Sequence, residues 1–236
     1  HIEQLYHDTF LNNCVKLKQM LINIGIIFKL ISRAIFPRKC IGCKTYDFWI
    51  CEKCISKVPK SFENTFSWSY SIFKYQNKLI RKAIWLIKFN KKHSVLNDLE
   101  KTIVENFDIF IKKNNLKNKK IILVPIPITK KSMNKRRYNQ STLICKILIK
   151  DKEDFKLEES FLKKTKNHSP QNKIKNRATR LENVRNSFGV GNVEKIKSQT
   201  IVLIDDVVTT GATLKEARKV LKTSGARKVL AFVLAH

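Results

Sequence analysis

One stretch, from Ile201 to Thr213 (IVLIDDVVTTGAT), constrains this chain more than any other feature. Four aliphatic residues predict a buried strand, and two adjacent carboxylates end it. A loop of hydroxyl residues and glycine follows, and a helical pattern begins at Leu214. Open α/β sheets place a strand, a short loop and a helix in this order, and they bind ligands beyond the carboxyl ends of their strands. We therefore expect an α/β fold with a ligand site at this loop.

The residues of this stretch also indicate what the ligand is. Backbone N–H groups and hydroxyls between Thr209 and Thr213 can surround a phosphate at the start of the helix, and Gly211 lets the backbone approach it closely. Asp205 and Asp206 can accept hydrogen bonds from two neighbouring hydroxyls, as on a ribose. A sugar diol joined to a terminal phosphate fits both halves. The plainer alternative is a buried strand before an ordinary helix, with solvated acids.

The stretch resembles the signature of type I phosphoribosyltransferases, whose fold is a parallel sheet flanked by helices. This resemblance implies 5-phosphoribosyl-1-pyrophosphate (PRPP) as the ligand, together with Mg²⁺. It also implies that the carboxylate pair contacts the ribose hydroxyls and that the loop binds the 5-phosphate. The predicted PRPP-binding residues are Asp205, Asp206, Val207, Val208, Thr209, Thr210, Gly211, Ala212 and Thr213.

Four of the six cysteines form a second pattern. Cys40 and Cys43 make one C-x2-C pair, and Cys51 and Cys54 make another. Four thiolates complete a tetrahedral zinc shell, which leaves no open position for catalysis and supplies folding energy to a small segment. We predict a structural Zn²⁺ site at about residues 37–59. Disulfides are the alternative, but nothing else in the sequence indicates an oxidising compartment.

The chain carries a net charge of +29 at pH 7, and the basic residues gather in two segments. Such an excess attracts polyanions, although frequent Lys, Ile and Asn also indicate an AT-rich genome. The first segment runs from Lys130 to Arg137 and the second from Lys163 to Arg185. A solvated, lysine-rich surface is the alternative to a binding role. The residues predicted to bind pyrophosphate or DNA are Lys130, Lys131, Arg136, Arg137, Lys164, Arg177 and Arg180.

Hydrophobic periodicity predicts alternating strands and helices in most of the remaining chain. Strands are expected at 67–75, 121–127, 201–204 and 228–234, and helices at 79–92, 103–111, 138–150 and 214–223. The last strand, helix and strand form a βαβ unit. Residues 151–200 are polar, basic and irregular, which is consistent with a flap. We divide the chain into an N-terminal helix and zinc-binding module (1–60) and a phosphoribosyltransferase-like domain (61–236).

Residues 20–36 are apolar, but Lys29 and Arg33 interrupt them. A membrane span needs about 20 apolar residues, so we interpret this segment as a docked amphipathic helix. Peripheral membrane contact is the alternative. The segment also lacks the small-residue cleavage site of a secretory signal. We therefore expect a cytoplasmic protein with no transmembrane segment.

Joined to the four cysteines, the PRPP signature resembles the ComF family of competence proteins. The likeness extends from about Ile27 to the end of the chain. An aliphatic run, a proline and the first cysteine pair of that family are matched from Ile35 to Cys40. Its tyrosine and lysine-bearing helix are matched between Tyr75 and Phe89, although Gln76 and Asn77 replace the family's acidic–glycine pair.

Two further blocks carry the same resemblance. The V-P-x-P strand stands at 124–127, and basic residues followed by an aromatic-Asn-Gln stand at 135–140. The last block runs from Lys164 to Phe188. Asn139 and Gln140 are candidates for orienting the ligand, with helix capping as the alternative for Asn139.

The ComF resemblance implies a role in natural transformation. It implies a competence factor that binds single-stranded DNA and PRPP and aids DNA import into the cytoplasm, in contact with the DNA-uptake machinery of the inner membrane. The basic segments support this physically, because phosphate neutralisation drives salt-sensitive binding of single strands. An active phosphoribosyltransferase of nucleotide metabolism is the alternative, and a regulator that uses the site as a sensor is a third hypothesis.

Overall fold

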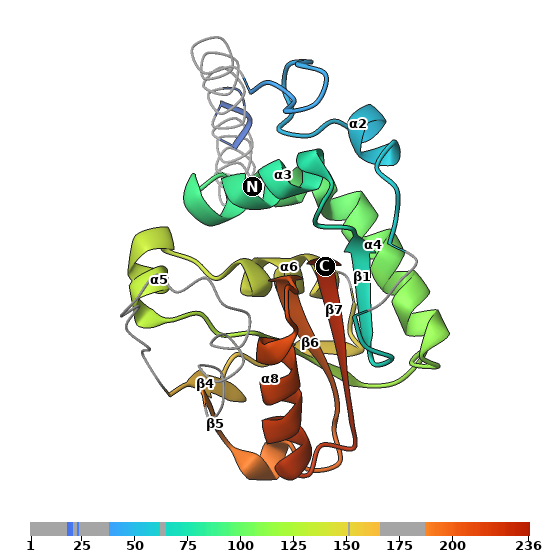
Figure 1. Cartoon of the computed structure of the whole chain (residues 1–236), viewed down its shortest axis with the longest axis vertical. Helices are drawn as coiled ribbons and strands as arrows, with labels where there is room; N and C mark the ends of the chain where they lie inside the picture. Colours follow the sequence, from blue (N-terminus) through green and yellow to red (C-terminus); the bar gives the residue numbers. More distant parts are fainter. Residues whose placement is uncertain (1–17, 21–22, 24–37, 62–64, 151, 166–186) are drawn as a thin grey trace, which may run out of the picture.

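A five-stranded parallel sheet forms the centre of the protein (Figure 1). This computed structural model describes residues 18–20, 23, 38–61, 65–150, 152–165 and 187–236. The sheet has the order β1-β7-β6-β2-β3, and every neighbouring pair is parallel. The predicted α/β fold class, a phosphoribosyltransferase-like parallel sheet flanked by helices, is confirmed. The strands are β1 (Ser69–Phe73), β2 (Ile121–Pro125), β3 (Phe155–Leu157), β6 (Thr200–Val207) and β7 (Lys228–Ala235).

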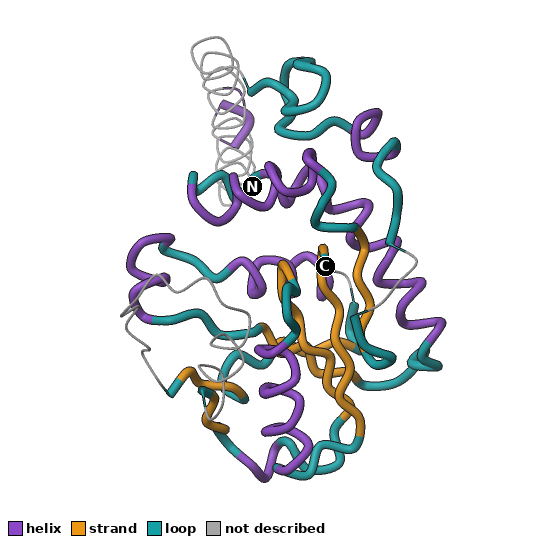
Figure 2. The backbone as a smooth tube through the Cα atoms, in the orientation of Figure 1, coloured by secondary structure: helices purple, strands orange, loops and turns teal. Residues whose placement is uncertain are grey.

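Helices cover both faces of this sheet, as its continuous aliphatic strands require (Figure 2). Alternate residues of β6 pack on opposite faces of the sheet. Val202 and Ile204 belong to the buried cluster that includes α4 (Val95–Lys113) and α6 (Gln140–Ile149). Ile201 and Leu203 join the opposite cluster, with α8 (Ala212–Thr223). The predicted βαβ unit at the end of the chain is thereby confirmed.

The helix α3 (Lys78–Phe89) lies beyond the carboxyl ends of β6 and β7 (Figures 1 and 2). Asn77 begins it, because its side-chain oxygen accepts hydrogen bonds from the backbone N–H groups of Leu79 and Ile80. This Asn is one of the two residues that depart from the ComF pattern, and the structure gives it a local role as the helix cap.

The structure adds elements that the periodicity did not predict. Helix α5 (Lys130–Arg136) has no buried residue, so it carries no apolar period to recognise. Helix α4 begins at Val95 instead of residue 103. Residues 151–200 are not uniformly irregular: they contain β3 and an antiparallel pair, β4 (Leu162–Lys164) and β5 (Phe188–Val190). These strands have three residues each, too few to show an alternation.

The segment that carries the four cysteines (residues 40–54), which we call the cysteine segment, packs against α4. The Asp98 carboxylate accepts hydrogen bonds from the backbone N–H groups of Trp49 (2.7 Å) and Ile50 (3.2 Å). The indole of Trp49 donates to the Ser94 hydroxyl (2.9 Å). Ile50 also belongs to the same buried cluster as α3 and α4. The segment is therefore attached through both polar and apolar contacts, while the division of the chain at residue 60 stays a prediction.

The helix expected at residues 20–36 falls almost entirely outside the described residues. Among the helices that the structure does describe, none combines the length and apolar character needed to cross a bilayer.

Candidate functional site

The loop between β6 and α8 forms a small hollow at the carboxyl edge of the sheet. Its volume is about 40 Å³, and a single water needs roughly 10–15 Å³. A group of a few heavy atoms, such as a phosphate, fits at the N-terminus of α8, where N–H groups and the helix dipole favour an anion. The hollow is lined by Asp205, Val207, Val208, Thr209, Thr210, Gly211, Ala212, Thr213 and Leu214.

Gly211 is required here for two reasons. Its φ is +73°, in the left-handed region that other residues rarely adopt. A Cβ at this position would also lie 2.2 Å from the Cζ atom of Phe66. The ring of Phe66 stacks on Trp68, with centroids 4.7 Å apart. Because this stack presses against the loop, any side chain at Gly211 would displace it.

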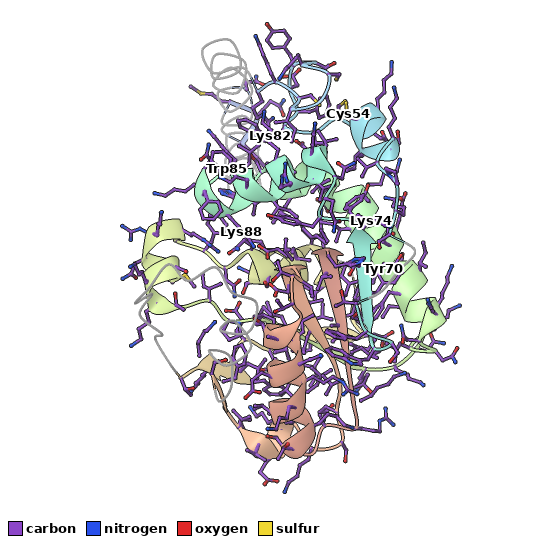
Figure 3. The ribbon with its side chains drawn as sticks, in the orientation of Figure 1. Cys54, Tyr70, Lys74, Lys82, Trp85 and Lys88 are labelled. Carbon is purple, nitrogen blue, oxygen red and sulfur yellow. The ribbon has the colours of Figure 1, made fainter. Side chains whose placement is uncertain are left out.

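Asp206 does not line the hollow but is held from the other side. It is 3% exposed. Its Oδ1 lies 2.9 Å from Nζ of Lys88, on α3, and its Oδ2 accepts a 2.9 Å hydrogen bond from the Gln140 amide at the start of α6. Figure 3 shows Lys88 on the side of α3 nearer the sheet. Two helices therefore converge on one buried carboxylate.

Asp205 is partly buried and faces the hollow. Its Oδ1 accepts hydrogen bonds from the Asp206 backbone N–H (2.9 Å) and from the Ser141 hydroxyl (3.3 Å). Burial, followed by the charge of Asp206, raises the pKa of Asp205 to about 7, although Lys88 and these two hydrogen bonds lower it. Near neutral pH this carboxyl can therefore exist in both protonation states.

Lys88 and Ser141 are the side chains that the structure adds to the predicted pair. Gln140, which the sequence already offered as a candidate for orienting the ligand, donates to Asp206. In the sequence, Lys88 stands four residues after the buried Ile84, so it lies at the edge of an apolar helix face. A lysine in that position was the available signal. Asn139 caps α6 by accepting from the Ser141 N–H (3.0 Å), as its plainer interpretation expects.

The first basic segment lies at the same edge of the sheet, because α5 follows the end of β2. Lys130, Lys131, Lys135 and Arg137 are exposed. The guanidinium of Arg136 stands 5.5 Å from the ring centroid of Phe89, at the end of α3. The structure thus brings α5 and α3 together.

Of the second basic segment, Lys164 lies within electrostatic range of Asp205. Burial lowers the pKa of Lys164, and the charge of Asp205 acts in the opposite direction. Arg177 and Arg180 lie outside the described residues.

The four predicted metal ligands come together in the N-terminal segment. The Sγ atoms of Cys40, Cys43, Cys51 and Cys54 all lie within 4.8 Å of one another. Zinc–sulfur bonds of about 2.3 Å in a tetrahedron put sulfurs roughly 3.8 Å apart, so the cluster fits a zinc ion. All four cysteines are free rather than disulfide-bonded.

The local structure supports this cluster. The Thr45 side chain first, and then its backbone, lower the pKa of Cys43 to about 6, which favours the thiolate that a metal requires. Burial acts in the opposite direction on the second pair, because it raises the pKa of Cys51 and raises that of Cys54 to about 12. A Cβ on Gly42 would lie 2.7 Å from Sγ of Cys54. Gly42 therefore leaves room for Cys54 to lie close to the first cysteine pair.

Comparison with known proteins agrees with this geometry. Residues 148–236 match the phosphoribosyl transferase domain family. The chain is 27% identical over 115 residues to Competence protein F of Haemophilus influenzae, an alignment that spans 48% of this chain and 49% of that protein. It is 44% identical over 43 residues to the transcriptional regulator GfcR of Methanosphaera stadtmanae, spanning 18% of this chain and 22% of the regulator.

These matches support the predicted relationship to a ComF-like, phosphoribosyltransferase-related family. They also support a competence-related, phosphoribosyltransferase-like role. The chain spans only about half the length of Competence protein F and about a fifth of GfcR.

Replacing Cys40 with Ser should release the metal and destabilise the N-terminal segment, because three thiolates hold zinc less tightly than four. Metal analysis after dialysis should find about one zinc per chain in the unaltered protein and much less in Cys40→Ser. Cys145→Ala, which removes a buried thiol from the sheet core, is the matched control and should keep its zinc. Equal zinc in both variants would exclude the four-cysteine site.

Replacing Asp205 with Asn should stabilise the ligand-free protein at pH 8. The raised pKa means that the folded protein keeps a proton that the unfolded chain releases above about pH 4, so stability falls as pH rises towards 7. An amide has no such dependence. Urea unfolding should show a larger gain for Asp205→Asn at pH 8 than at pH 5, and no such trend for Asp154→Asn, an exposed acid. A variant less stable than the original at pH 8 would contradict this.

Proposed function

We propose that this ComF-like, phosphoribosyltransferase-related chain is a cytoplasmic competence factor that binds PRPP and single-stranded DNA and aids DNA import, in contact with the DNA-uptake machinery of the inner membrane. The proposal rests on the groups that the fold brings together at the carboxyl edge of the sheet. A phosphate-sized hollow, the carboxylate pair of Asp205 and Asp206, and the basic helix α5 meet there.

The parts of PRPP match the parts of this edge. The 5-phosphate would occupy the hollow at the N-terminus of α8, and Asp205, which lines the hollow, would accept hydrogen bonds from the ribose diol. Asp206 would hold Lys88 in place as a cation beside the diphosphate. Lys130 and Lys131 on α5 would add positive charge on the same edge. Mg²⁺ would supply further neutralisation of the diphosphate.

DNA binding is supported by the charge of the chain and its distribution. Phosphate neutralisation by Lys and Arg releases counterions and favours any nucleic acid. The exposed cations of α5 and the contact between Arg136 and Phe89 place charge and an aromatic ring together, as proteins that bind single strands require.

Two other functions use the same site, and measurements of turnover and of DNA affinity separate them from the proposal. An active phosphoribosyltransferase of nucleotide metabolism is favoured by the domain match alone, and a ligand sensor by the similarity to GfcR. Pyrophosphate release from PRPP in the presence of a nucleobase or amine would indicate the transferase. Tight PRPP binding without turnover and without DNA affinity would indicate the sensor.

Changing both carboxylates to amides should abolish PRPP binding. An amide that must also donate hydrogen bonds pairs poorly with a diol, and the Asp206→Asn change removes the charge that holds Lys88. Calorimetry with Mg²⁺ and PRPP should detect binding to the original chain and none to Asp205→Asn/Asp206→Asn. Circular dichroism should confirm that the variant folds, and the Asp154→Asn chain is the control. Unchanged affinity would refute the assigned roles.

Single-stranded DNA should bind with strong salt dependence. Filter binding should give an affinity that falls linearly on a logarithmic scale of salt, with a slope of about −0.7 for each phosphate neutralised. Substituting Gln for Lys130 and Lys131 together should weaken binding. No affinity at low salt would refute the DNA-binding part of the proposal and leave the PRPP part to calorimetry.

A further inference from the structure

One face of α3 combines cations with aromatic rings. The spacing of these residues, three or four positions apart, places them on a single stripe of the helix. The opposite face, with Ile80, Ala83 and Ile87, is buried in the core. The stripe, which we call the α3 stripe, consists of Lys78, Arg81, Lys82, Trp85, Lys88 and Phe89.

The two rings of the stripe are unusually open to solvent. Trp85 is 49% exposed and Phe89 is 50% exposed, and their ring centroids are 6.4 Å apart with the planes inclined at 42°. Together with Tyr75 and Ile84, the stripe lines a groove of about 450 Å³, within the usual range of ligand sites. Figure 3 shows Lys82, Trp85 and Lys88 in succession along α3. The rings therefore offer flat apolar surface inside a groove.

The charge of this groove has one sign. Lys78, Arg81 and Lys82 are exposed, and no acidic residue lines the groove in the described part of the chain. Arg136 lies against Phe89 and joins the stripe to the cations of α5. A groove with cations and open rings is complementary to a polyanion that carries flat rings.

We infer that the α3 stripe binds single-stranded DNA, with bases stacked on Trp85 and Phe89 and phosphates held by Lys78, Arg81 and Lys82. Base faces are open only in an unpaired strand, so the rings select single strands over a duplex. Lys88 belongs both to the stripe and to the pair with Asp206, so the strand lies next to the proposed PRPP site. This inference rests on the proposed function and assigns its DNA-binding surface.

The aromatic half of the inference is tested with Trp85→Ala/Phe89→Ala. Fluorescence anisotropy with an oligothymidylate of about 20 nucleotides should show at least about ten-fold weaker binding. The matched control is Tyr46→Ala/Phe48→Ala, which removes two other exposed rings (56% and 43% exposed) from the cysteine segment. The control should bind as the original chain does. Equal affinity of the stripe variant and the original chain would overturn the inference.

The electrostatic half is tested with two triple variants of equal charge. Lys78→Gln/Arg81→Gln/Lys82→Gln should reduce the slope of affinity against salt by about 2 on the logarithmic scale. Lys117→Gln/Lys119→Gln/Lys120→Gln removes three exposed cations at the opposite, amino end of β2 and should leave the slope unchanged. Equal changes in both triples would show that only total charge matters, and would overturn the assignment to α3.

A duplex of the same length separates stacking from charge. The Trp85→Ala/Phe89→Ala change should leave the affinity for the duplex unaltered, and an equal loss for duplex and single strand would contradict stacking on unpaired bases. If the original chain binds no single-stranded DNA at all, the proposed function fails together with the inference. If the original chain binds and the stripe variants bind equally well, only the inference fails.

Discussion

The burial of a carboxylate at the end of β6 is the constraint on which the rest of the site depends. Asp206 is 3% exposed, and a buried charge is costly unless it is paired and hydrogen-bonded. Lys88 and Gln140 provide both partners, which requires α3 and α6 to meet above the same strand. Burial, followed by the charge of Asp206, raises the pKa of the preceding residue, Asp205. The site thus stores unfavourable charge that a ligand with hydroxyl donors can relieve.

The helix α3 connects the functions that we assign to this chain. Its inner face belongs to the main core, Asn77 begins it, and Lys88 near its end meets Asp206. Its outer face carries the stripe, and Phe89 meets the cation of Arg136 on α5. A single rigid element therefore borders both the candidate sugar-phosphate site and the candidate DNA surface. The cysteine segment is hydrogen-bonded to α4 through Asp98.

The last strand, helix and strand of the fold were predictable because these strands are long and aliphatic. Strands β6 and β7 have eight residues each, and the helix between them has a regular apolar face. The unpredicted elements are those without a hydrophobic signal. Helix α5 buries nothing, and β4 and β5 owe their existence to pairing with each other across the chain. Local patterns cannot show such pairing, because the partner is distant in sequence.

The sequence by itself determined the chemistry of two sites: the order of carboxylates, hydroxyls and glycine after β6, and the spacing of four cysteines. These are local arrangements, since neighbouring residues create the loop and each C-x2-C turn. Only the tertiary structure decided which side chains complete them. Lys88 reaches Asp206 from 118 positions earlier in the chain, and Phe66 packs where a Cβ on Gly211 would stand. The physical reason is that parallel pairing collects the carboxyl ends of distant strands at one edge. Helices from elsewhere in the chain meet at that edge, and their side chains pair with the buried carboxylate of Asp206.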